Sequence, residues 1–225
     1  GQTALMVASG DGSLEMVEML LEHKDIDVNI ADNDRNTALS YAISSVQVKM
    51  VKLFLDKGAD PNAVIGKGQT PALIHLVGYV ADTSTSSVQG VNDKLREILG
   101  LLLTSNDIRI DVRGPNGSTA LMTAIRNQSV ELTKLLLEKE ANTEIKNKEG
   151  ESAMSLASKL GTDTRIVTLL EDKRTAWNNL MFQAVGNSNV DEVKKLLEKG
   201  VANVHARKSG SSGRRKGDSL LETAI

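Results

Sequence analysis

The 225-residue chain has no cysteine, very few aromatic residues and no long apolar run. The absence of cysteine excludes disulfide bonds and thiolate metal sites, and it is compatible with a reducing compartment. Aromatic residues make up only 2% of the sequence, less than a single globular core of this length would use. No apolar run approaches the roughly 20 residues that a membrane-spanning helix needs. We therefore expect neither one large aromatic core nor membrane insertion.

The chain also lacks a large excess of charge of either sign. Lys and Arg number 27 against 29 Asp and Glu, which gives a net charge of −2. This balance argues against a nucleic-acid partner and against an anionic membrane surface. Apolar residues make up 40% of the sequence. Buried Leu and Met side chains would each stabilise a core by roughly 1.5–3 kcal/mol.

What the sequence does contain is a motif that returns about every 33 residues. The block TALMVA begins at Thr3 and returns in modified form at Thr37, Thr119 and Ser152, with a related block at Thr70. Thr3 to Thr37 is 34 residues, and Thr119 to Ser152 is 33. A period in this range is typical of proteins built from stacked repeats.

A second motif follows each block at a constant distance. A pair of large apolar residues lies 17 and 18 residues after the first residue of the block, at Leu20-Leu21, Phe54-Leu55, Leu136-Leu137 and Leu169-Leu170. Short polar breaks separate the two motifs. Each unit is therefore predicted to be a short helix, a tight turn and a longer amphipathic helix. The Thr or Ser that opens each block is a predicted N-cap, and Gly58 and Gly200 are predicted to close outer helices.

These motifs resemble the ankyrin repeat. TALMVA stands where that family usually has TPLHLA, and residues 57–62 (KGADPN) correspond to its GADVNA. The usual His is replaced by Met6, Ser40 and Met122, and only His75 comes near that position. We expect the loss of this His to weaken the polar tie between neighbouring units. The resemblance implies an all-α, ankyrin-type solenoid of stacked helix-turn-helix units.

The repeat positions divide the chain into two parts. Residues 1–171 are predicted to hold five ankyrin-like repeats, the third with an insertion near 81–92. Residues 172–225 are predicted to hold a sixth repeat, a basic loop at 207–216 and a partial seventh repeat. Because both ends interrupt a repeat, we expect the chain to be a segment of a longer protein.

The insertion in the third unit is polar and of low complexity. We interpret residues 81–90 as a loop without a binding role, followed by an outer helix near Asp93–Leu103. A functional loop is the alternative. The basic loop at 207–216 is interpreted as solvated, with an acidic partner or a phosphate as the alternative ligand.

The junction between the fifth and sixth units is unusually short. Ala157 to Ala184 is only 27 residues, which leaves no room for the usual projecting turn. We expect the stack to change direction here. Trp177, the only tryptophan, is predicted to fill the gap left by the missing turn, with a ligand contact as the alternative.

No pattern in the sequence indicates catalysis. His23, His75 and His205 lie in different units without metal-ligand spacing, and no glycine-rich phosphate loop follows a strand pattern. We expect no catalytic site, no metal and no cofactor, and we interpret the chain as a non-enzyme.

The resemblance places the binding surface on the concave side, at the turn tips and the inner-helix ends. Carried over position by position, the candidate partner-binding residues are Asp34, Asn36, Ser44, Ser45, Lys67, Gln69, Tyr79, Asn116, Ser118, Arg126, Asn127, Lys148, Glu151 and Lys159. Of these, Arg126 is the expected hot spot, because Arg is enriched at such sites.

We expect the partner to be another protein and the segment to be monomeric and cytoplasmic, or delivered into a host cell if the source is a bacterium or parasite. The alternative is a targeting or regulatory array of a larger enzyme, secreted effector, toxin or channel whose active domain lies outside these residues.

Overall fold

The computed structural model describes residues 1–82 and 89–200, apart from the side chains of residues 81, 82 and 89. The predicted basic loop at 207–216 and the predicted partial seventh repeat lie outside the described residues, as does the middle of the predicted insertion.

The described residues form eleven helices and one short hairpin. The elements are α1 (Ala4–Gly10), α2 (Leu14–Leu21), α3 (Ala38–Ser44), α4 (Val48–Asp56), β1 (Val64–Ile65), β2 (Thr70–Pro71), α5 (Ala72–Asp82), α6 (Gln89–Thr104), α7 (Ala120–Arg126), α8 (Val130–Glu138), α9 (Ala153–Leu160), α10 (Thr164–Gly186) and α11 (Val190–Lys199).

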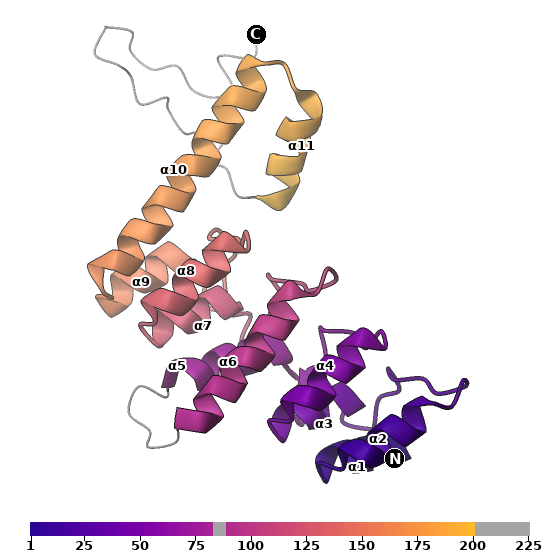
Figure 1. Ribbon diagram of the computed structural model, residues 1–225. Helices are drawn as coiled ribbons and strands as arrows, with labels where there is room; N and C mark the ends of the chain where they lie inside the picture. The colour runs from indigo at the N-terminus through magenta and orange to yellow at the C-terminus, as the bar shows by residue number, and fades with distance from the viewer. Residues whose placement is uncertain (83–88, 201–225) are drawn as a thin grey trace, which may run out of the picture.

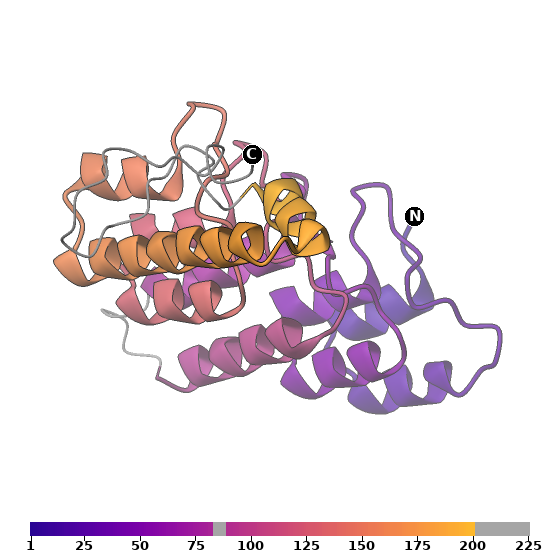
Figure 2. The ribbon, with the colours of Figure 1, turned by 90° about the horizontal axis from the view of Figure 1, so that it is seen from above.

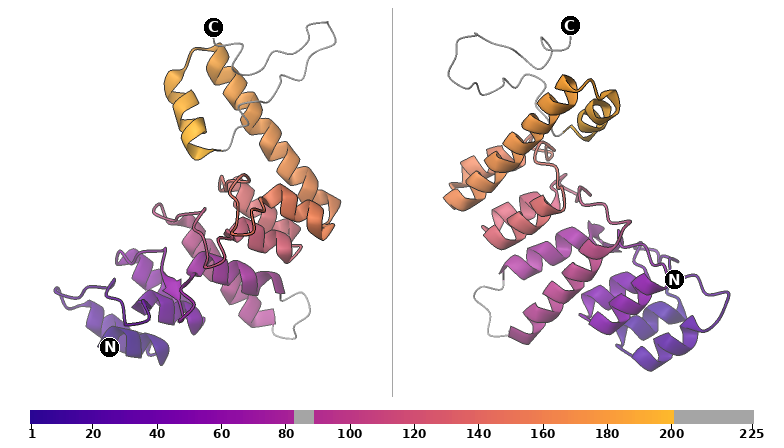
Figure 3. Two further views of the ribbon diagram at one scale, coloured as in Figure 1. Left: turned by 180° about the vertical axis from the view of Figure 1, so that it is seen from behind. Right: turned by 45° about the horizontal axis from the view of Figure 1, so that its top comes forward.

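The helices stack as pairs along the chain (Figure 1). Inner helices α1, α3, α5, α7 and α9 each pack against the outer helix that follows, and α7 lies between α5 and α9. The helix pairs of successive units are seen as successive layers in the tilted view (Figure 3, right). The predicted all-α repeat solenoid is confirmed.

The helices begin at the N-cap residues and end at the glycines that the sequence predicts. The side chain at the head of each block accepts a hydrogen bond from the backbone N–H three residues later, at Thr3, Thr37, Thr119 and Ser152. Gly58 and Gly200 adopt left-handed φ angles of 82° and 61°, which glycine tolerates without a Cβ clash.

The third unit differs from the predicted one. α5 continues to Asp82 and α6 begins at Gln89, so the predicted loop at 81–90 and the predicted outer-helix start near Asp93 are wrong at these residues. α5 gains residues 81 and 82, and α6 gains residues 89–92. Val91 in the added turn of α6 is 40% exposed, so this turn extends the helix without adding to the core. The start of the unit also differs, because Thr70–Pro71 pair with Val64–Ile65 in an antiparallel hairpin.

Neighbouring units are tied by polar contacts despite the missing His. Ser40 stands at the family's His position, and its Oγ donates to the backbone oxygen of Val64 at 2.6 Å. The expectation of a weakened tie is therefore wrong at Ser40, because a hydroxyl there reaches the next unit.

Asparagines form a ladder along the ends of the outer helices. Asn29 Nδ2 donates to Gly58 O at 3.1 Å, and Asn62 Nδ2 donates to Asp107 O at 2.9 Å in the next unit. Asn142 Nδ2 donates to Lys199 O, the last residue of α11. The end of α11, in the sixth unit, is therefore tied to the fourth unit, two units back along the stack.

The junction between the fifth and sixth units lies within one helix. α10 runs without a break through residues 171 and 172, and its far half extends beyond the stack (Figure 1). α11 lies beside this half (Figures 1 and 2). One continuous core runs from Leu5 to Leu170, whereas Trp177, Met181, Ala184 and Leu196 form a second, small cluster. The direction of packing thus changes within α10.

Candidate protein-binding face

Four loops connect outer helices to the next inner helices, and we call them fingers. Finger 1 is residues 30–36, finger 2 is 63–69, finger 3 is 112–118 and finger 4 is 143–151. The fingers and the C-terminal ends of the inner helices make up a surface that we call the finger face. It contains the positions that the sequence predicts for partner binding.

Arg126, Glu151 and Lys159 meet on the finger face. Arg126 NH2 lies 3.3 Å from Glu151 Oε2, and Lys159 Nζ lies 2.5 Å from Glu151 Oε1. They come from the end of α7, from finger 4 and from the end of α9. The Lys159 hydrogen bond, helped by one from Asn147, lowers the pKa of the Glu151 carboxyl. Glu151 is therefore held charged between two cations.

Tyr79 presents an exposed aromatic ring on α5, the inner helix that packs against α7. Its side chain is 57% exposed on the last turns of α5, and its ring centroid lies 4.6 Å from that of His75. Burial lowers the pKa of His75, which favours the neutral imidazole. Asn127 Nδ2 donates to Gly78 O at 3.2 Å and so ties the end of α7 to the turn that carries Tyr79.

Finger 1 is held by a network around Asp32. The Asp32 carboxylate accepts from Tyr41 Oη at 2.7 Å and from the backbone N–H groups of Asp34 and Asn36. Asn36 Oδ1 accepts from Gly66 N of finger 2 at 2.7 Å. Asn36 thus joins two fingers, whereas the Asp34 side chain is exposed.

The remaining predicted residues are mostly exposed. Exposed side chains are those of Ser44, Lys67, Gln69, Asn116 and Lys148. Gln69 Oε1 accepts from Arg35 NH1 at 3.2 Å across fingers 1 and 2. Ser45 is half-buried, and its Oγ donates to Gly10 O at 3.2 Å. Ser45 therefore ties α3 to α1.

Ser118 is the exception, because it is only 4% exposed. Its predicted contact with a partner stays a prediction, and the burial of this side chain within finger 3 leaves little of it accessible. The Ser118 backbone N–H donates to Asn116 Oδ1 at 3.0 Å, so the chain turns there and buries the small hydroxyl.

Sequence reasoning missed Arg113 and Lys146, which lie near the start of fingers 3 and 4. Arg113 Nε donates to Gly117 O at 3.3 Å, and its NH2 donates to Lys146 O. Both side chains are exposed. Arg113 and Lys146 each lie six residues before the first residue of a block. A comparison of this position between units would have shown the two charges.

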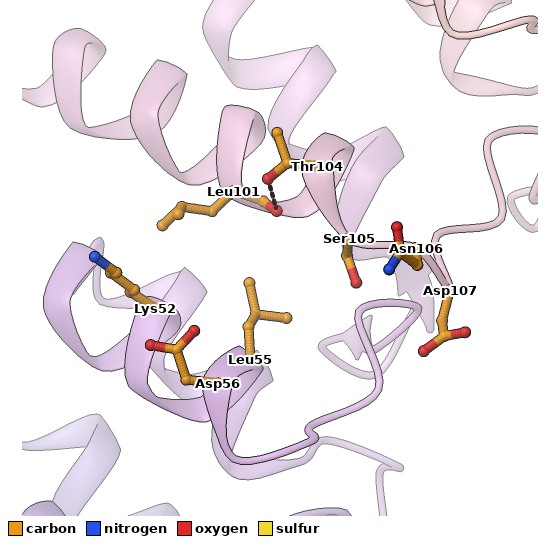
Figure 4. Close-up of a pocket in the computed structure, with 8 residues that line it drawn as sticks. All are labelled: Lys52, Leu55, Asp56, Leu101, Thr104, Ser105, Asn106 and Asp107. Carbon is orange, nitrogen blue, oxygen red and sulfur yellow. Dashed lines mark hydrogen bonds between the residues drawn. The ribbon is translucent and has the colours of Figure 1, made fainter.

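The opposite, outer side of the stack carries two open grooves along the seam of α4 and α6. The groove in Figure 4 has a volume of about 320 Å³, with Lys52, Leu55 and Asp56 facing residues 101–107 of the next unit. The second has about 360 Å³ and lies nearer Lys49 and Glu97. Neither groove includes a predicted partner-binding residue.

Across residues 1–82 and 89–200, no group of three or more His, Asp or Glu side chains is arranged to hold a metal ion. No helix there combines the length and the apolar character needed to span a bilayer.

The chain is similar to parts of several known proteins. The chain is 29% identical over 147 residues to human transient receptor potential cation channel subfamily A member 1. The match covers 65% of this chain and 12% of the channel. It is 29% identical over 216 residues to the mouse B-cell lymphoma 3 protein homolog, covering 94% of this chain and 40% of that protein. A putative ankyrin repeat protein of fowlpox virus is 33% identical over 125 residues, covering 56% of this chain and 26% of the viral protein. The chain thus spans less than half of each relative.

A family profile described as ankyrin repeats (3 copies) matches residues 1–65 and 87–179, which is more than half of the chain. The matched residues include α1–α4 and α6–α9, together with the N-caps Thr3, Thr37, Thr119 and Ser152. The chain therefore belongs to the ankyrin repeat family.

Proposed function

We propose that this chain is a protein-binding scaffold that holds a partner protein on the finger face. Ankyrin repeats are in general protein-interaction modules. Stacked repeats create extended surfaces because each unit adds a similar element beside the last. The partner would therefore contact several units at once.

One observation carries the proposal. Matched positions in successive units are alike in the core and different on the finger face. Ala8, Ala42, Ala124 and Ala157 occupy one core position and are all buried. The position seven residues after the start of the block is instead exposed and different in each unit, with Gly10, Ser44, Arg126 and Lys159. A uniform scaffold with a chemically mixed surface is what selective recognition of a protein requires.

The experiment combines Tyr79→Ala, Arg126→Ala and Lys159→Ala in the full chain. Binding to a co-purified partner is measured by calorimetry and compared with Lys52→Ala and Lys134→Ala, which lie on outer helices α4 and α8. We expect the triple variant to lose affinity by about tenfold or more, because aromatic and Arg side chains dominate interfaces. Unchanged affinity, with the helical circular dichroism intact, would exclude the finger face.

A second candidate is that the chain is a targeting or regulatory array of a larger protein. It is supported by relatives such as the human channel and an Arabidopsis thaliana E3 ubiquitin-protein ligase, of which the chain matches 12% and 8%. Its test is the sequence of the full-length parent: a catalytic or membrane domain beyond these residues supports it, and a parent of repeats alone contradicts it.

A further inference from the structure

The two ends of the finger face carry charge of opposite sign. At the N-terminal end, Asp11 closes α1, and Asp32 and Asp34 lie on finger 1. The nearby Arg35 donates from its NH1 to Gln69 Oε1 at 3.2 Å. This end is therefore rich in carboxylates.

Cations predominate toward the C-terminal end of the finger face. Among the described residues of fingers 2–4 and the ends of α7 and α9, the cations are Lys67, Arg113, Arg126, Lys146, Lys148 and Lys159, and the carboxylates are Glu144, Glu149 and Glu151. The chain as a whole has a net charge of −2, so this excess is local and does not follow from composition.

The Glu151 carboxylate does not occupy all the N–H donors of Arg126 and Lys159. Arg126 and Lys159 each give one hydrogen bond to Glu151. A guanidinium has five N–H donors and an ammonium has three. The Arg126 and Lys159 side chains are 42% and 69% exposed, so further donors can reach a ligand from solvent. The ion pairs with Glu151 hold the Arg126 and Lys159 side chains in position.

An exposed aromatic ring lies on the inner helix that packs against α7. Tyr79 is on α5, and the Asn127–Gly78 hydrogen bond holds the end of α7 against the turn that carries Tyr79. Exposed tyrosine and arginine side chains are typical anchors at protein interfaces.

We propose that the finger face binds an acidic segment of a partner protein, with its carboxylates on Arg126 and Lys159 and an apolar side chain on Tyr79. This inference rests on the proposed function and adds the chemistry of the partner. Carboxylates match the planar donor fork of Arg in a bidentate contact. Asp32 and Asp34 at the other end would repel an acidic chain, so the acidic part of the segment is confined to the C-terminal end of the face. The same acidic end disfavours a nucleic-acid strand along the face.

The experiment selects ligands for the full chain from a display library of random, unstructured peptides. We expect the selected peptides to be enriched in Asp and Glu, and their affinity to fall as salt is raised, because exposed charges are screened. The variant pair Arg126→Gln and Lys159→Gln should weaken binding by about tenfold or more.

The matched control is Lys134→Gln with Lys195→Gln, which removes the same charge from exposed positions on α8 and α11. We expect it to leave affinity within about twofold, since distant charges contribute little at ordinary salt. A second selection uses Arg126→Glu with Lys159→Glu and should enrich Lys and Arg. Circular dichroism and urea titration of every variant separate loss of binding from loss of fold.

The outcomes distinguish the two proposals. Peptides that need Tyr79 but show no acidic bias would overturn the acidic partner and leave the protein-binding face intact. Peptides insensitive to every finger-face substitution, or no selected peptide at all, would overturn both. A single-stranded oligonucleotide that binds more tightly than the peptides, and is lost with Arg126→Gln and Lys159→Gln, would replace the protein partner with nucleic acid.

Discussion

At the residue scale, Glu140 occupies a position where the backbone favours glycine. It follows the C-cap of α8 with a φ of 64°, comparable to the 82° of Gly58 and the 61° of Gly200. A left-handed residue with a Cβ costs roughly 1–2 kcal/mol. Its carboxylate accepts from Lys173 Nζ at 2.6 Å and from Trp177 Nε1 at 3.4 Å. The two contacts offset the unfavourable backbone and connect the main stack to α10.

The first residue-scale prediction concerns the core. Leu136 is 0% exposed in α8, so Leu136→Ala should lower the free energy of unfolding by about 2–5 kcal/mol in a urea titration. The matched control is Leu160→Ala, because Leu160 is 41% exposed at the end of α9. We expect a loss of about 1 kcal/mol or less there. Equal losses would contradict the assigned helix register.

A second residue-scale prediction concerns Thr133. Its side chain is 0% exposed, and Oγ1 has no hydrogen-bond partner among the residues that the structure describes. Thr133→Val keeps the shape and removes the unpaired hydroxyl, so it should raise the free energy of unfolding by about 1 kcal/mol. Thr133→Ala, which also leaves a cavity, should lower it. A destabilised Val variant in thermal or urea unfolding would show that the hydroxyl is paired in solution.

At the element scale, α10 shows what sequence spacing can and cannot predict. The 27-residue interval from Ala157 to Ala184 predicts that the turn between units is missing, and residues 171–174 contain no Gly or Pro to break a helix. The structure accordingly has one helix there.

The Asn142–Lys199 contact joins residues 57 apart, and no local pattern indicates it. The longer α5 and α6 were missed because polar, low-complexity residues at the insertion resemble a loop.

The attachment of α10 to the fourth unit gives a pH prediction. Burial raises the pKa of Glu140, but the hydrogen bond and charge of Lys173 outweigh it, so the pKa lies below its ordinary 4.5. A carboxyl with a lowered folded-state pKa stabilises the fold above its unfolded pKa, and that stabilisation is lost as pH falls through the folded value. Trp177 fluorescence should therefore change below about pH 4.5, because Trp177 contacts this carboxylate.

The control for this prediction is Glu140→Gln. It keeps the side-chain shape and removes the titrating group, so the fluorescence change should be lost or moved to the pH of global acid unfolding. Far-UV circular dichroism records that unfolding separately. An identical fluorescence titration in the two proteins would show that Trp177 reports another carboxyl.

At the scale of the whole molecule, the repeat positions alone predict the stacked helices and most of the core. Buried positions recur in phase, so one motif predicts Leu39, Leu121 and the equivalent residues of other units. The finger face was predicted less well. Its positions follow from the repeat, but the pairing of Glu151 with both Arg126 and Lys159, and the burial of Ser118, depend on how finger 3 and finger 4 fold. Tertiary contacts of this kind leave no periodic trace in the sequence.

Binding of a protein through the finger face is the central claim, and site-specific photo-crosslinking tests it most directly. A benzophenone side chain replaces Tyr79 on the finger face in one protein and Lys134 on outer helix α8 in another. Each is irradiated with a partner that binds the unmodified chain. The account predicts a covalent product from position 79 and none from position 134. A product from position 134 alone would contradict it and place the partner on the outer side.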